Sequence, residues 1–196
     1  MANMEDKYHH GNLRQALIDA GVRIINEEGE QSLSLRKAAA ACGVSHSAPY
    51  AHFKDKKELL DAIKVSVTEQ FSAYLFEAVE KEKGESTEKA IVTMGRNYVK
   101  FFLENPDYYQ FLFYNQGITI HLTAGETHDE DYPPYLMLKE LFFRFLEENN
   151  LSLSEEEKEL RLIKIWVTVQ GVASIACMKN VVASKPWEAY LEQLIN

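Results

Sequence analysis

The sequence predicts an all-α protein in two parts, a three-helix N-terminal helix-turn-helix domain followed by a larger helical bundle. Apolar residues recur at helical spacing along most of the chain, which is the pattern of amphipathic helices. Only nine Gly and five Pro occur among 196 residues, so few positions interrupt these helices. Side chains that cap helices precede several of the apolar segments. About nine helices account for the whole pattern.

The N-terminal domain is expected over residues 1–55. Its first helix is predicted at 12–28, after a polar lead that holds Lys7. A second helix is predicted at 34–42, and a third, short one at 47–53. Gly43 lies between them, where a turn requires a backbone conformation open to glycine. Pro49 fits the first turn of the short helix, because its missing N–H has no partner there.

The second part is expected over residues 56–196 and begins with a long helix at 56–83, which links the two parts. Asp55 is predicted to cap this helix, and Ser86 and Ser154 are predicted to cap two later helices. Asn12 is predicted to cap the first helix, and Ser45 or Ser47 the short one. Lys56 and the amino end of the long helix could together hold a phosphate, and Lys7 could either contact phosphate or belong to a solvated tail. Further helices are expected at 87–104, 106–116, 134–148, 155–179 and 186–195, with a loop at 117–132.

Helix, glycine turn and short helix form the helix-turn-helix plan, which lays its second helix in the major groove of DNA. The polar side chains of this unit suit that use, since they donate hydrogen bonds to phosphates or base edges. Ala48 could contact a thymine methyl group. The residues expected to meet DNA are Ser34, Arg36, Ser45, His46, Ser47, Ala48, Tyr50, His52, Lys54 and Lys56.

The stretch from Leu33 to Leu60 resembles the DNA-binding domain of TetR-type transcriptional regulators. The matching residues are Gly43-Val44-Ser45, Tyr50-x-His52-Phe53, Lys56 and Leu59-Leu60. The element Trp166-x-x-x-Gln170-Gly171 resembles the Trp-x-x-x-His-Gly element of the WHG-type C-terminal domain in one branch of that family, with Gln in place of His. The resemblance implies a homodimer that pairs through the helices expected at 155–179 and 186–195. Its two N-terminal domains would then meet successive major grooves of a palindromic operator.

The distribution of charge agrees with this division. Residues 1–64 contain nine Lys and Arg and nine Asp and Glu, whereas residues 65–196 contain the remaining twelve and twenty-one. The formal net charge of −9 therefore belongs to the part that would face away from DNA. Local charge near a phosphate matters more than the total, because screening limits charge interactions to about 8 Å at physiological salt.

A second set of residues is aromatic and is interpreted either as plain core or as a pocket for a small apolar or aromatic effector. The expected function is a ligand-responsive repressor, and the alternative is a helical small-molecule-binding protein without operator binding. The candidate ligand residues are Tyr98, Phe102, Tyr109, Phe113, Tyr114, Phe142, Trp166 and Gln170.

No cofactor, metal site or enzymatic activity is expected. His121, His128 and the acidic residues 129–131 form the one cluster of acidic residues and histidines in the sequence, and we interpret it as a solvated charged loop. Cys42 and Cys177 are expected to be free thiols in a reducing cytoplasm. The N-terminal residues lack the apolar segment of a signal peptide, and no run is long enough to span a membrane.

Overall fold

The computed structural model describes residues 13–115, 118–125, 127–128, 131–178 and 180–195. The predicted roles of Lys7 and of Asn12 as a cap fall outside this part of the chain. The described residues form eight α-helices and no strand, which confirms the all-α prediction. The helices are α1 (Leu13–Glu28), α2 (Leu35–Ala41), α3 (Lys56–Glu80), α4 (Thr87–Glu104), α5 (Pro106–Gln110), α6 (Pro133–Glu148), α7 (Glu155–Ala176) and α8 (Glu188–Leu194).

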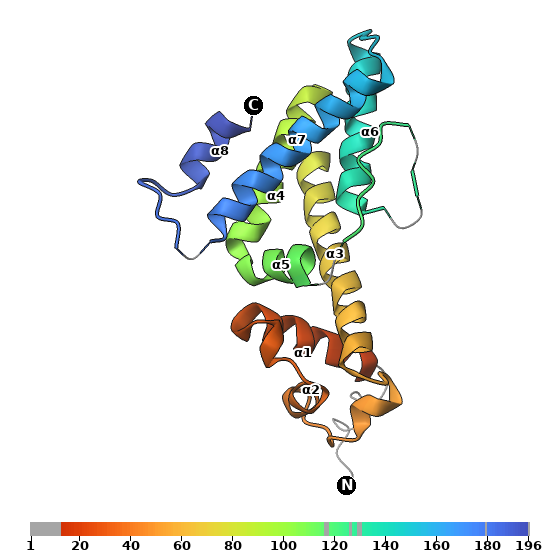
Figure 1. The fold of residues 1–196 in the computed structure, drawn as a ribbon, viewed down its shortest axis with the longest axis vertical. Coiled ribbons are helices and arrows are strands. Elements are labelled where there is room, and N and C mark those ends of the chain that lie inside the picture. The colour runs from red at the N-terminus through yellow and green to blue at the C-terminus, as the bar shows by residue number, and fades with distance from the viewer. Residues whose placement is uncertain (1–12, 116–117, 126, 129–130, 179, 196) are drawn as a thin grey trace.

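The long helix α3 organises the molecule (Figure 1). Its first turns pack with α1 in the N-terminal domain, and its later turns run beside α4 and α6 in the bundle. The helix α7 packs on α4, and the short α8 follows it beside α4. A displacement of α3 in the bundle would therefore reach the N-terminal domain directly.

A close contact between α1 and α3 fixes the N-terminal domain. A Cβ atom at Gly21 would lie 2.3 Å from Cδ1 of Ile63, so the absence of a side chain lets the two helices approach. Leu17, Ile25 and Leu59 are fully buried around this contact. The core continues without a break from these residues into the bundle.

The predicted caps at Asp55, Ser86 and Ser154 are confirmed, because each depends on residues close in sequence. Asp55 accepts a hydrogen bond from the Glu58 backbone N–H at 2.9 Å. Ser86 accepts one from Lys89 N at 3.2 Å. Ser154 and Glu157 form a reciprocal capping box at the start of α7. These bonds satisfy N–H groups that have no partner inside the helix.

Three predicted helices differ in the structure. The short helix expected at 47–53 is one 3-10 turn, η2 (Ala48–Ala51). The helix expected at 106–116 consists of α5 followed by a π-helical turn, η3 (Phe111–Asn115). The helix expected at 56–83 ends at Glu80, since the chain turns there toward Gly84, which has a φ of +101°. None of the described helices is both long and apolar enough to cross a membrane.

Candidate nucleic-acid interface and ligand site

The turn between α2 and η2 has the geometry that the glycine predicts. Gly43 has a φ of +68°, in the left-handed region. Its N–H donates to Ala40 O at 3.1 Å, and the N–H of Val44 donates to Ala39 O at 3.1 Å. These bonds close the end of α2, as in a Schellman motif, and direct the chain into the second element of the helix-turn-helix.

The turn η2 has one buried and one exposed side. Pro49 is buried on it and Phe53 is buried just after it, so both anchor the turn to the domain core. Tyr50 has 59% of its surface exposed, which rules out a core role for this side chain. Ser45, His46 and Ser47 are also exposed, whereas Ala48 and His52 are half-buried. The six predicted DNA-binding residues of this segment are thus all at least partly exposed.

The hydrogen bonds at the beginning of η2 are made by backbone groups and not by serine side chains. We expected Ser45 or Ser47 to cap this element, but neither side chain makes a cap hydrogen bond. The two hydroxyls lie 3.1 Å from each other instead. The N–H of Ala48 donates to Ser45 O at 3.0 Å, and the N–H of Tyr50 donates to Ser47 O at 3.2 Å. Both hydroxyls therefore remain on the surface.

The cations near η2 differ in their surroundings. Arg36 and Lys54 are exposed and form no ion pair with any described residue. Lys56 is half-buried, and its ammonium donates to Glu30 O at 3.1 Å. Ser34 uses its hydroxyl oxygen to accept from Lys37 N at 3.1 Å as the cap of α2. Of the three cations predicted to meet DNA, Arg36 and Lys54 are thus more accessible than Lys56.

The carboxylates of Asp55 and Glu58 occupy the amino end of α3. Asp55 caps the helix, and Glu58 accepts a hydrogen bond from Lys54 N at 2.7 Å. We expected this end to hold a phosphate together with Lys56. Because two carboxylates already lie there, a phosphate contact by Lys56 depends on its remaining N–H donors and not on the helix end.

The structure brings most of the candidate ligand residues together between α4, α5, η3 and α7. The hydroxyl of Tyr109 donates to the side-chain oxygen of Gln170 at 3.0 Å. The ring centroid of Tyr109 lies 5.2 Å from that of Phe102 and 5.0 Å from that of Phe113. The hydroxyls of Tyr114 and Ser174 lie 3.4 Å apart at the exposed edge of this cluster. A surface cavity of about 400 Å³ borders it.

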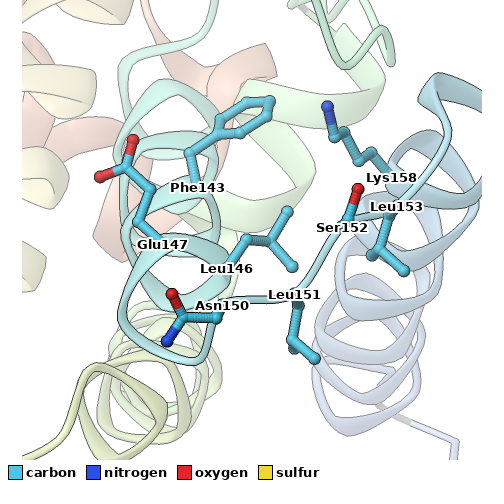
Figure 2. Close-up of a pocket in the computed structure, with 8 residues that line it drawn as sticks. All are labelled: Phe143, Leu146, Glu147, Asn150, Leu151, Ser152, Leu153 and Lys158. Carbon is cyan, nitrogen blue, oxygen red and sulfur yellow. The ribbon is translucent and has the colours of Figure 1, made fainter.

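Phe142 does not join this cluster. Its ring lies 5.9 Å from Phe143, and it lines a separate groove of about 350 Å³ between α4, α6 and α7. Another cavity, of about 520 Å³, lies at the turn between α6 and α7 (Figure 2). It is lined by Phe143, Leu146 and Lys158 among others, and none of the predicted ligand residues belongs to it.

Two tyrosines absent from the prediction, Tyr132 and Tyr135, also pack around Trp166. Trp166 and Tyr98 are buried, with ring centroids 5.5 Å apart. Tyr135 and Tyr132 contact the same indole, at 5.3 and 6.2 Å. Tyr132 lies in a segment expected to be loop, directly before Pro133, so helical periodicity gave no signal for it.

The loop cluster of histidines and acids is more ordered than expected. Asp131 is buried, accepts a hydrogen bond from His128 N at 2.8 Å and lies 2.7 Å from Nδ1 of His121. The His128 bond and the His121 contacts lower the pKa of Asp131 to about 2. Residues 129 and 130 lie outside the described part of the chain. Within the described part no group of three metal-type ligands is found.

The two cysteines have no reactive geometry. Both are free thiols. Burial raises the pKa of the Cys177 thiol to about 11, and its Sγ donates to Phe102 O at 3.3 Å. A thiol with a raised pKa is a poor nucleophile. Cys177 therefore acts as a packing residue.

Known proteins resemble this chain in sequence at its N-terminal end and in fold over most of its length. Residues 17–63 match the family model described as bacterial regulatory proteins, tetR family. The tetracycline repressor protein class D of Escherichia coli is 29% identical over 142 residues. That match covers 72% of this chain and 57% of the repressor.

Two solved structures share the fold. A protein of unknown function from Rhodococcus sp. RHA1 has a TM-score of 0.72 and 21% identity, and the match covers 95% of each chain. The transcriptional regulator FadR from Bacillus subtilis, solved in complex with stearoyl-CoA, has a TM-score of 0.60 and 14% identity, and the match covers 93% of this chain and 95% of that one. Residues 17–63, with their glycine turn and exposed η2, are therefore similar to the N-terminal domain of the tetR family of bacterial regulatory proteins.

Proposed function

We propose that this protein is a ligand-responsive transcriptional repressor that acts in the cytoplasm and binds a palindromic DNA operator as a homodimer. The observation that carries the proposal is the exposed side of η2, presented by a tetR-family N-terminal domain. Tyr50, His46 and Ser47 are accessible there as hydrogen-bond donors. Such residues at the start of a recognition element reach base edges, and flanking cations hold phosphates.

The proposed homodimer would form through α7 and α8. The outer side of α7 carries exposed apolar residues at helical spacing, among them Leu160, Val167 and Ile175. A Cβ atom at Gly171, on the same side, would meet nothing within 4 Å in this chain. A partner helix could approach closely at that position and bury the apolar residues.

The proposed division into a DNA-binding domain at 1–55 and a ligand-binding, dimerising domain at 56–196 explains how an effector would act. A small apolar or aromatic molecule among α4 to α7 would displace α3, which begins directly after η2. The distance between the two N-terminal domains of the dimer would then no longer match successive major grooves, about 34–36 Å apart. The effector must bind the two states with unequal affinity to cause this change.

A gel-shift experiment with DNA from upstream of the protein's own gene tests the proposal. We expect a retarded complex whose affinity falls steeply with salt, because neutralised phosphates release counterions. A complex that persists in the presence of excess competitor DNA of unrelated sequence would show that binding is specific. A protein that binds small molecules but shifts no upstream fragment at low salt would instead be the alternative, a helical binding protein without an operator.

A further inference from the structure

Three buried tyrosine rings surround one indole, that of Trp166, inside the bundle. Tyr98, Tyr132 and Tyr135 are 1%, 2% and 0% exposed, and each ring meets Trp166 edge to face. None of the three hydroxyls has a hydrogen-bond partner among the residues that the structure describes. A buried polar group without a partner costs about 1–3 kcal/mol. Phenylalanine would fill the same space without that cost, so the hydroxyls call for another explanation.

The surroundings define what these hydroxyls can bind. Burial raises the pKa of Tyr98 and of Tyr132 well above the ordinary value of 10. Burial, together with the nearby carboxylates of Asp131 and Glu159, raises the pKa of Tyr135 to about 12. All three phenols are therefore neutral donors at physiological pH. The same two carboxylates disfavour an anionic ligand beside Tyr135.

We propose that Tyr98, Tyr132 and Tyr135 form the polar end of the effector site and bind the carbonyl oxygen of an uncharged aromatic molecule that packs on Trp166. This inference rests on the proposed function and names the chemical class of its effector. An aromatic body suits the edge-to-face packing around the indole, and a carbonyl oxygen accepts two hydrogen bonds.

Occupation of this site would act on α3. The ring centroids around Trp166 lie only 5.3–6.2 Å from the indole, so the tyrosines fill the space between them and a ligand must separate them. Phe71 of α3 lies 5.1 Å from Tyr98 and 6.5 Å from Tyr132. Separation of these rings therefore displaces the helix that continues into the DNA-binding domain.

Three matched pairs of probes test the proposal on the full-length protein. Acetophenone, benzophenone and 9-fluorenone each carry a carbonyl group, and ethylbenzene, diphenylmethane and fluorene carry CH₂ in its place. Binding is measured by calorimetry and by quenching of Trp166 in a Trp187→Phe background. We expect at least one ketone to bind about tenfold or more tightly than its hydrocarbon, which is the worth of one good hydrogen bond.

The triple variant Y98F/Y132F/Y135F should remove the preference for the ketone and leave binding of the hydrocarbon unchanged. Tyr108→Phe is the control, because Tyr108 is also buried but packs on Phe101 and not on the indole. The proposal is overturned if every ketone binds no better than its hydrocarbon, or if the triple variant keeps the preference.

Two further measurements distinguish a failure of the proposed effector site from a failure of the proposed function. The urea midpoint of each single Tyr→Phe variant should stay unchanged or rise, since the substitution removes an unpartnered hydroxyl. A clear fall in all three midpoints would mean that the hydroxyls are satisfied within the folded protein, which contradicts the proposal. A gel shift of the wild type and the triple variant reports DNA binding independently. If both bind DNA and no ketone is preferred, the effector site fails while the proposed regulator stands.

Discussion

The phenol of Tyr109 donates its hydrogen bond to the side-chain oxygen of Gln170 at 3.0 Å. This bond joins α5, next to the π-helical turn η3, to the middle of α7. It also gives the side chain of Gln170 a definite structural role. A neutral amide accepts this bond at every physiological pH.

We predict that Tyr109→Phe and Gln170→Leu each lower the free energy of unfolding by about 0.5–1.5 kcal/mol, the usual net value of one hydrogen bond. The double variant should lose little more than Tyr109→Phe alone, because that substitution removes the bond to the Gln170 side chain together with a longer one, of 3.3 Å, to Gln170 O. Urea denaturation of the four proteins measures this coupling. Fully additive losses would show that the two side chains stabilise the protein independently.

The N-terminal domain provides a second prediction, which concerns operator binding. Tyr50→Phe combined with His52→Ala removes two donors from the exposed surface near η2 without touching the buried anchors Pro49 and Phe53. The dissociation constant for the operator should rise about 10- to 100-fold, the effect of losing one or two specific contacts. Gel shifts measure it, and size-exclusion chromatography checks that the oligomeric state is unchanged.

Tyr108→Phe is the matched control for this experiment. Tyr108 is buried on α5, where its ring centroid lies 6.1 Å from that of Phe101, so it belongs neither to the surface near η2 nor to the proposed dimer interface. The variant should bind operator like the wild type. Normal binding by the Y50F/H52A variant would count against η2 as the recognition element.

The buried carboxylate of Asp131 predicts a dependence of stability on pH. Its pKa is lowered from 3.8 to about 2, so the folded state is stabilised above the unfolded pKa. This contribution is present above about pH 4 and is lost as the pH falls toward 2. Asp131→Asn should therefore lower the free energy of unfolding by roughly 1–3 kcal/mol at pH 6, and by much less near pH 2.5.

Thermal or urea unfolding at several pH values measures the difference in the free energy of unfolding between the wild type and Asp131→Asn. Asp61→Asn serves as the control, because Asp61 is exposed on α3 and its replacement should change stability little at any pH. If the free energy of unfolding of the wild type and of Asp131→Asn differs by the same amount from pH 6 to pH 2.5, ionisation of Asp131 is not the cause of the difference.

How far the sequence predicted the fold follows from the range of each interaction. The caps at Asp55, Ser86 and Ser154 depend on residues three positions away, so they were predicted correctly. The positive φ of Gly43 follows in the same way from its own residue type. The 3-10 form of η2 was not predicted, because the packing of Pro49 and Phe53 limits it to one turn.

The candidate ligand site was predicted only in part, because its residues lie far apart in the sequence. Tyr109 and Gln170 are 61 residues apart, and only the packing of α5 on α7 brings them together. Tyr132 and Tyr135 lie on either side of two prolines, at which a new helix begins. The spacing of apolar residues therefore does not predict which way these two side chains face. Phe142 has the same spacing as buried neighbours but faces another groove. Membership of a core can be read from spacing, whereas membership of one particular site cannot.

The exposed apolar side of α7 leads to a last prediction, about the oligomeric state. Val167 has 58% of its surface exposed in the single chain, and Gly171 follows one turn later with open space around it. Val167→Glu would place a charge without a partner in the proposed dimer interface, which should raise the dimer dissociation constant by roughly two orders of magnitude or more. Analytical ultracentrifugation should then find a dimer for the wild type and a folded monomer for the variant. Val65→Glu makes the same substitution at an exposed valine of α3, outside the proposed interface of α7 and α8, and should stay dimeric. A wild type that is monomeric at all concentrations, or a Val167→Glu protein that remains a dimer, would place the interface elsewhere or remove it.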